Sequence, residues 1–191
     1  MSDTPKRIVL AITGASGACY GVRLLRYLAD TGHRVDLVVS PTGEQVIAHE
    51  VGPGALADLP GAVTRHGFGN LASPIASGSC QYDAMAIVPA SMGTVGRLAA
   101  GCSSDLVGRA GDVCLKERRR LVIAPRETPM SLIHLRALAT LAEAGAVIMP
   151  AAPAFHGKPT TLDELVDGFV GRILDSLGIG TDLVRRWSGE L

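Results

Sequence analysis

The chain has 191 residues, 47% of them hydrophobic and 19% charged, which is enough for one α/β domain with a well-filled core. Lysine plus arginine and aspartate plus glutamate both number 18, so no overall charge attracts nucleic acid or an anionic membrane, and neither is an expected partner. Any site for an anion must therefore be local.

Two further features concern the cellular compartment. Residues 1–6 are polar and no run of about eighteen apolar residues occurs, so we expect neither a signal segment nor a membrane span. The four cysteines contain no C-x-x-C pair and are expected to be free thiols. Together these features predict a cytoplasmic protein.

The first predicted unit is a strand, a tight loop and a helix. Residues 7–12 form a short, apolar, β-branched run that is typical of a buried parallel strand, and the apolar spacing over 18–30 predicts a helix. Between them, the loop Thr13-Gly14-Ala15-Ser16-Gly17 allows close backbone approach at its glycines. Free backbone N–H groups at the start of the helix would make this junction a site for phosphate.

The spacing of this loop excludes several known sites. It has neither the G-x-G-x-x-G of a dinucleotide site nor the P-loop pattern, and Gly14 to Gly17 is one residue too short for the G-x-S-x-G nucleophile elbow. The second predicted strand ends in Ser40, with no carboxylate there to hold a ribose. The loop therefore disfavours NAD and leaves open a mononucleotide phosphate or a plain βα turn without a ligand.

The rest of the chain alternates strands and helices. Strands are expected at 34–39, 84–89, 121–124 and 146–149, and helices at 42–50, 95–100, 105–116, 131–144 and 161–177. Residues 51–75 are rich in glycine and proline and predict an irregular segment, and a C-terminal tail covers 179–191. The alternation predicts a single α/β domain over 1–191, a Rossmann-like (flavodoxin-like), doubly wound parallel sheet.

Ligands of such sheets bind at the C-terminal ends of the strands, so the loops there carry the functional information. These loops combine proline with small, hydroxyl or charged residues, and one of them places Arg126 and Glu127 between Pro125 and Pro129. An arginine there can hold an anion and the adjacent carboxylate can move a proton, although a local salt bridge would also account for the pair.

Six motifs, in this order along the chain, resemble the UbiX-type flavin prenyltransferases, part of a wider group of homo-oligomeric flavin-binding proteins that includes flavin-dependent cysteine decarboxylases. They are Thr13-Gly14-Ala15-Ser16-Gly17-Ala18 and the segments 76–79, 89–94, 115–122, 125–129 and 145–150. The resemblance extends from about Arg7 to Trp187, and the ordered set is much more specific than any one motif.

The resemblance implies a reaction and a set of site residues. Such enzymes transfer a dimethylallyl group from dimethylallyl monophosphate to N5 of reduced FMN and close a ring onto C6, without a metal, and the prenylated FMN serves UbiD-type decarboxylases. The positions that match FMN-binding residues are Gly14, Ala15, Ser16, Ser40, Ser91, Met92, Gly93, Thr94 and Arg126. Those that match prenyl phosphate-binding residues are Arg109, Lys116, His156 and Arg172, and the catalytic positions are Ser16, Glu50, Lys116 and Glu127.

These residue types suit the implied chemistry. Breaking the allylic C–O bond puts negative charge on the leaving phosphate, and preformed lysine and arginine donors stabilise that charge more in the transition state than in the ground state. Ring closure requires proton movement, for which carboxylates are suited. A site without a metal therefore needs several cations beside a few carboxylates.

One position departs from the family pattern. The family usually has a tyrosine after the phenylalanine at 155, and its hydroxyl hydrogen-bonds the prenyl phosphate; here the residue is His156. A neutral imidazole can still donate one hydrogen bond, and a protonated one would add a cation. We therefore expect phosphate binding with a new pH dependence and an altered donor choice or rate, or a homologue that has lost the transfer step.

Other functions stay open at this point. One is a flavin-dependent cysteine decarboxylase, although Met92 stands where the asparagine expected after the Pro-Ala-Ser turn would be. Another is an FMN-binding homologue without transferase activity, such as an accessory subunit. The basic run from Lys116 to Arg120 is more typical of a solvated helix end than of a nucleic-acid patch. The resemblance also implies a homododecamer with flavin sites between the subunits of trimers.

Overall fold

The computed structural model describes residues 4–184, 186, 187 and 189. The strands are β1 (Arg7–Ile12), β2 (Arg34–Val39), β3 (Val63–His66), β4 (Ala84–Ala90), β5 (Arg120–Pro125) and β6 (Val147–Ile148). The helices are α1 (Ala18–Asp30), α2 (Pro41–Glu50), α3 (Met92–Ala99), α4 (Leu106–Lys116), α5 (Leu132–Glu143) and α6 (Leu162–Leu177), with one short 3-10 helix, η1 (Pro74–Ala76).

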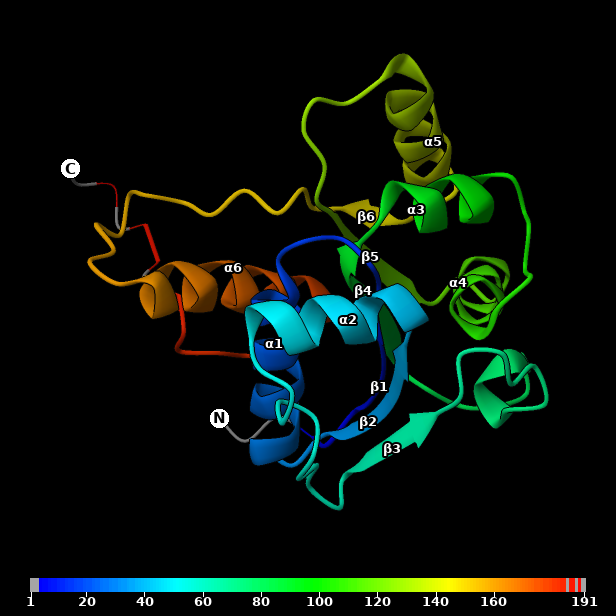
Figure 1. Ribbon diagram of the computed structural model, residues 1–191, viewed down its shortest axis with the longest axis horizontal. Helices are drawn as coiled ribbons and strands as arrows, with labels where there is room; N and C mark the ends of the chain where they lie inside the picture. Colours follow the sequence, from blue (N-terminus) through cyan, green and yellow to red (C-terminus); the bar gives the residue numbers. More distant parts are fainter. Residues whose placement is uncertain (1–3, 185, 188, 190–191) are drawn as a thin grey trace.

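The six strands form one parallel sheet in the order β3-β2-β1-β4-β5-β6 (Figure 1). The order reverses between β1 and β4, where the first half of the chain passes to the second. In a doubly wound sheet, ligands bind beside this reversal, at the C-terminal ends of the strands. The expected fold class is therefore confirmed, and the reversal marks where a ligand should bind.

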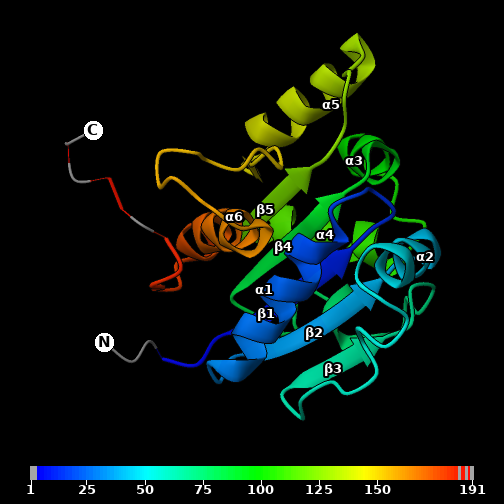
Figure 2. The same cartoon turned by 60° about the vertical axis from the view of Figure 1, so that its left-hand side comes forward.

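The sheet separates two hydrophobic clusters, one on each face. Helices α1 and α6 lie on one face, and α3, α4 and α5 lie on the other (Figure 2). Side chains of β1 alternate between them: Ile8, Leu10 and Ile12 pack with α1 and α6, whereas Val9 and Ala11 pack on the side of α3, α4 and α5. Because both faces are covered, β1 is apolar throughout and lacks the polar alternation of a half-exposed strand.

Two expectations about elements were wrong. The segment expected to be irregular, 51–75, contains strand β3 and the start of η1, so the sheet has six strands rather than five. β3 is an edge strand paired with β2, and none of its residues is fully buried, so its sequence lacks an apolar strand pattern. Helix α3 begins at Met92 and not at 95, because the Ser91 side chain caps the earlier turn.

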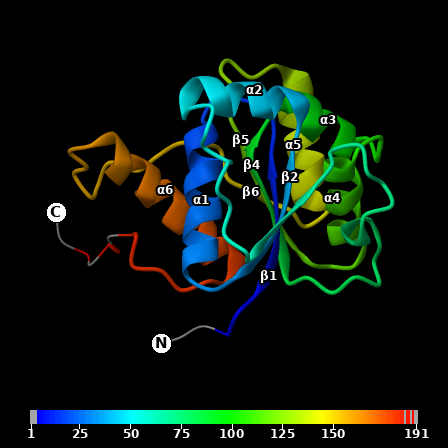
Figure 3. The same ribbon diagram turned by 60° about the horizontal axis from the view of Figure 1, so that its bottom comes forward.

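Helix α2 lies across the end of the sheet at which β1 and β2 finish (Figure 3). Its close approach depends on Gly43, where an added Cβ would lie 2.7 Å from the Ile12 carbonyl oxygen. Within the described part of the chain, no helix is long and apolar enough to cross a membrane.

Candidate functional site

The ends of four neighbouring strands are tied together by hydrogen bonds that the strand-to-helix loops make with one another. The bonds join Ser40 N to Ile12 O (3.0 Å), Thr13 Oγ1 to Pro89 O (2.8 Å), Ser91 N to Thr13 Oγ1 (2.7 Å) and Arg126 N to Ala90 O (3.3 Å). The Thr13 hydroxyl donates to Pro89 O in β4 and accepts from Ser91 N, just after β4. It therefore fixes the end of β1 against the end of β4. We call this tied edge the strand-end cradle: residues 13–17, 40, 91–94 and 126.

Three helices begin at the strand-end cradle, and two of them begin with a serine cap. Ser40 Oγ accepts from Gly43 N at 3.0 Å, and Ser91 Oγ accepts from Thr94 N at 3.4 Å. Gly17, with φ of 102°, precedes the third helix, α1. Helix N-termini carry partial positive charge, so their convergence here favours an anionic ligand.

The N-terminus of α1 is filled by the protein's own carboxylate, contrary to the expectation of free N–H groups for phosphate. Glu50 Oε2 accepts from both Gly17 N and Ala18 N at 2.9 Å. Glu50 is the last residue of α2, and the packing of α2 over the loop brings it there. Gly14 permits this packing, because a Cβ at Gly14 would lie 2.5 Å from Thr42 Cγ2.

The surroundings of Glu50 determine its protonation. Partial burial alone would raise the pKa of Glu50, but hydrogen bonds from Ser16, Gly17 and Ala18 and the charge of Arg126 outweigh it and hold the pKa below its usual value. An ionised carboxylate has acceptors alone, so the Ser16 hydroxyl donates to Glu50 and its lone pairs remain for another donor. Ser16 and Glu50 therefore form one hydrogen-bonded pair.

Arg126 and Glu127 leave the end of β5 side by side without pairing with each other. The Glu127 carboxylate accepts from Thr128 N at 3.1 Å, and Arg126 takes part in none of the ion pairs found within residues 4–184, 186–187 and 189. The local salt bridge considered for this pair is thus not formed. The exposed guanidinium of Arg126 is available at the strand-end cradle.

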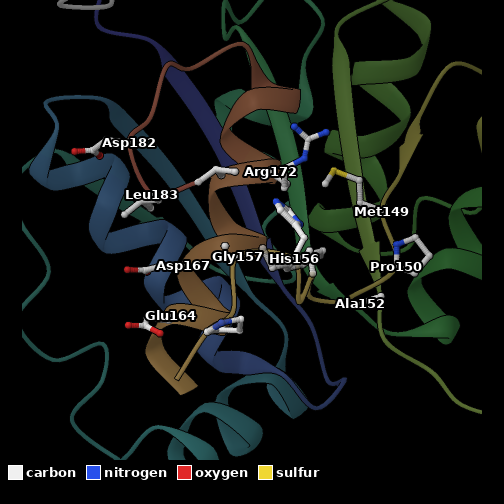
Figure 4. A pocket seen from close by; sticks show the side chains of 15 residues that line it. Met149, Pro150, Ala152, His156, Gly157, Glu164, Asp167, Arg172, Asp182 and Leu183 are labelled. Atoms are coloured by element: carbon white, nitrogen blue, oxygen red, sulfur yellow. The ribbon is translucent and has the colours of Figure 1, made fainter. Parts of the chain in front are cut away.

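His156 and Arg172 line a separate cavity of about 650 Å³ between α6 and the segment 149–159 (Figure 4). The segment leaves the sheet beside the cradle, since Ala151 N donates to Pro125 O at 3.0 Å. Arg172 Nη1 donates to Asp175 at 3.0 Å, and the His156 ring meets the Trp187 ring edge-on with their centroids 6.2 Å apart. Three carboxylates, from Glu164, Asp167 and Asp182, lie on the other side of the cavity.

Arg109 and Lys116 are not brought to this cavity. Both lie on α4, which packs on the face of the sheet opposite to α6. Lys116 also precedes β5, whereas Arg126 follows it, and the ends of that six-residue strand lie roughly 17 Å apart at about 3.3 Å per residue. Within one chain, the four residues expected to bind the prenyl phosphate therefore form two groups on opposite faces.

The comparisons with known proteins agree with the motifs. A family model described as Flavoprotein matches residues 1–174. The flavin prenyltransferase UbiX of Methanothermobacter thermautotrophicus is 42% identical over 187 residues, which cover 97% of each chain. The chain belongs to the UbiX-type flavin prenyltransferase family. The resemblance inferred from the six motifs is thereby confirmed.

Two solved structures of this family share the whole fold. A UbiX called AnUbiX or PadA1, in complex with FMN and dimethylallyl pyrophosphate, has a TM-score of 0.93 and 41% identity, covering 98% of this chain and 100% of that one. A dodecameric FMN-dependent UbiX-like decarboxylase from Escherichia coli O157:H7 has a TM-score of 0.91 and 38% identity, covering 96% of this chain and 100% of that one.

Sequence reasoning assigned no role to Thr13 in the site. Its side chain is 1% exposed and supplies two of the bonds between β1 and β4. A hydroxyl residue directly after a buried strand is a hint of such a role, because a buried hydroxyl must find hydrogen-bond partners.

Proposed function

We propose that this protein is a flavin prenyltransferase that joins the dimethylallyl group of dimethylallyl monophosphate to reduced FMN. The observation that carries the proposal is the strand-end cradle with its Ser16–Glu50 pair, in a chain whose relative was crystallised with FMN and dimethylallyl pyrophosphate. Reduced FMN, when bound, supplies N5 and C6 for bond formation. The product, prenylated FMN, would serve a UbiD-type decarboxylase in the cytoplasm, where the four free cysteine thiols are expected.

The strand-end cradle fits a flavin mononucleotide. Gly14, Ala15, Ser16 and Ser40 supply close backbone approach and hydroxyls at the ends of β1 and β2. Ser91, Met92, Gly93 and Thr94 form the first turn of α3, whose N–H groups and partial positive charge suit a phosphate or a flavin carbonyl. Arg126 adds a guanidinium at the same edge.

The cations for the prenyl phosphate come, we infer, from more than one copy of the chain. Arg172 and His156 lie on one face of the sheet and Arg109 and Lys116 on the other, so a single chain cannot gather them around one phosphate. Their combined charge would stabilise the leaving phosphate as the C–O bond breaks.

Helix α5 supports an assembly such as the dodecamer of the Escherichia coli relative. Its first turns expose three large apolar side chains, at 61% for Leu132, 77% for Ile133 and 50% for Leu135, on a helix that extends away from the sheet (Figure 2). Exposed apolar surface of this kind marks a contact with another protein. Light scattering at micromolar concentration should report an oligomer, and a stable monomer would contradict a shared site.

Three residues in or beside the strand-end cradle, Ser16, Glu50 and Glu127, would move protons. The Ser16 hydroxyl donates to Glu50, so Ser16 can accept a proton from a ligand donor as its own proton passes to the Glu50 carboxylate, which becomes a neutral carboxylic acid. Glu127 lies next to Arg126 at the end of β5 and is the second carboxylate. His156, in place of the usual tyrosine, would donate one hydrogen bond to the prenyl phosphate from its own cavity.

The deciding experiment is anaerobic incubation with reduced FMN and dimethylallyl monophosphate, followed by mass spectrometry of the flavin. The wild-type protein should yield a flavin heavier by one five-carbon unit. Parallel runs with the diphosphate establish the donor, and His156→Tyr tests the exceptional position. If neither protein forms an adduct while FMN binds normally, the transferase proposal fails and the chain is an FMN-binding homologue.

A further inference from the structure

Two of the sequence motifs, 76–79 and 115–122, have no place yet in the strand-end cradle, and the fold brings them into contact. Residues 76–80 begin at the last residue of η1 and run along α4 toward the start of β4. We call these residues the 76–80 loop. It touches both α4 cations that the proposed function assigns to the prenyl phosphate.

The contact with Arg109 is a hydrogen bond to the backbone of the loop. Arg109 Nε donates to the Ala76 carbonyl at 3.0 Å, and Nη1 donates to Asp112 at 2.8 Å. With two of its donors held, the planar guanidinium has a defined orientation. Its side chain is still 37% exposed, so it remains accessible to a ligand or to a neighbouring copy.

The contact with Lys116 is steric. The Lys116 ammonium pairs with the carboxylate of Glu117, and this pair lies directly against the backbone of Gly78. A Cβ at Gly78 would lie 2.2 Å from Glu117 Oε1 and 2.7 Å from Lys116 Nζ. Gly78 does not have a positive φ, so the glycine is required here for space rather than for backbone conformation.

Arg119 anchors the loop. Its Nη2 donates to Gly78 O at 2.6 Å and its Nη1 to Cys80 O at 2.8 Å, while the guanidinium lies 4.4 Å from the centre of the Tyr82 ring. The Tyr82 hydroxyl donates to Ala110 O of α4 at 3.2 Å. The loop is therefore held at Ala76 by Arg109 of α4, and at Gly78 and Cys80 by Arg119, which follows α4.

We propose that the 76–80 loop is a template that sets the positions of Arg109 and Lys116, and that Gly78 and Arg119 are positioning residues for prenyl transfer. The proposal rests on the proposed function, because it takes the two cations as phosphate-binding groups. A lysine has a long, flexible side chain, and its ammonium contributes fully to a transition state only if it is held in place beforehand. The template supplies that restraint without touching the substrate.

Gly78→Ala is the sharpest test, since the atoms that an added methyl meets are the ends of two flexible side chains. The pair can move aside at little cost in stability, so the melting temperature and the FMN affinity should stay unchanged. The rate of adduct formation at saturating donor should fall about tenfold or more, as expected for a displaced catalytic group. Gly69→Ala is the matched control, because a Cβ there meets nothing within 4 Å.

A double variant separates positioning from a general structural role. In a Lys116→Ala background, Gly78→Ala should cause little further loss of rate, because the group that it displaces is already gone. Arg119→Gln should likewise slow transfer mainly in proteins that retain Lys116. Unchanged turnover in Gly78→Ala, or losses that simply add to that of Lys116→Ala, would overturn the proposal.

A failure of the proposed transferase function can be distinguished from a failure of the template proposal. If the wild-type protein makes no adduct, the proposed function is wrong, whatever the template does. A crystal structure of Gly78→Ala still tests whether the 76–80 loop positions Lys116, because it shows directly whether Lys116 Nζ has moved relative to the wild-type protein. An ammonium in its original place would exclude the template.

Discussion

The strand-end cradle and the α4 region with its 76–80 loop are both polar regions beside one sheet, but they are built differently. The cradle consists mainly of backbone and short hydroxyl side chains, tied across four strands by bonds such as those of Thr13, which is 1% exposed. The α4 region presents long cationic side chains, Arg109 and Lys116, that are 37% and 46% exposed. The residues of the cradle come from one chain, whereas under the proposed function the α4 cations act at a site that is shared with another copy.

Under the proposed function, this difference separates the holding of the flavin from the stabilisation of the leaving phosphate. Rigid backbone donors suit a cofactor-sized ligand that must be held in one orientation, since they lose little entropy on binding. Long cations suit a charge that develops during the reaction, provided that a template holds them. Substitutions in one region that leave the function of the other unchanged therefore test this separation of roles.

The largest expected effect comes from Lys116→Ala. Removing one preformed donor to the leaving phosphate should slow adduct formation about a hundredfold to a thousandfold. FMN binding, measured by titration of flavin fluorescence, should be unchanged because the proposed function assigns Lys116 to the prenyl phosphate and not to FMN, whichever copy supplies it. Arg126→Ala should instead weaken FMN binding as well as slow transfer. Unaltered turnover in Lys116→Ala would show that this lysine has no role in transfer and is only a cation at the end of a helix.

Mixed oligomers sharpen the same prediction. If one copy supplies the cradle and another supplies Lys116, coexpressed Glu50→Gln and Lys116→Ala chains should regain activity in about a quarter of their sites by random assembly. Each variant alone should retain about one hundredth of the wild-type rate or less, which is too little to account for such recovery. A mixture no more active than its components would show that each chain works independently.

A smaller effect is expected for Glu50→Gln, of about a hundredfold on transfer. Since hydrogen bonds and Arg126 lower the pKa of Glu50, its carboxylate stays ionised above and somewhat below the usual glutamate value of about 4.3. Its contribution is therefore present at neutral pH and lost as the pH falls through that lowered pKa. The wild-type rate should fall on this acid side, and Glu50→Gln should lack this limb of the profile.

The smallest effect concerns stability. Thr13→Val keeps the shape of the side chain but leaves the partly buried Ser91 N–H without its acceptor, which should cost about 1–3 kcal/mol of unfolding free energy. FMN affinity should fall because the two loops of the cradle are no longer tied. Thr140→Val is the control, since the Thr140 hydroxyl lies on an exposed helix and donates to the carbonyl of Arg136. Urea titration of both variants measures the difference, and equal stabilities would contradict the role of Thr13.

Local patterns were sufficient for most of the fold. The apolar run at 7–12 and the helical spacing at 18–30 predicted β1 and α1 with their observed bounds, because both faces of the sheet are covered and a buried parallel strand must be apolar throughout. The sequence did not predict β3 because this strand lies at the edge of the sheet. Burial there is incomplete, so the apolar pattern typical of a buried strand is absent. The six motifs, read in order, identified the family.

The sequence by itself determined the fold class, the family and the residues that carry charge and hydroxyl groups at the strand ends. Only the tertiary structure decided which of those residues meet. It placed Glu50 on the N-terminus of α1, divided Arg109 and Lys116 from His156 and Arg172, and brought Gly78 against Lys116. The physical reason is that periodicity reports which side of an element is buried, whereas contacts between residues distant in the chain depend on how whole elements pack.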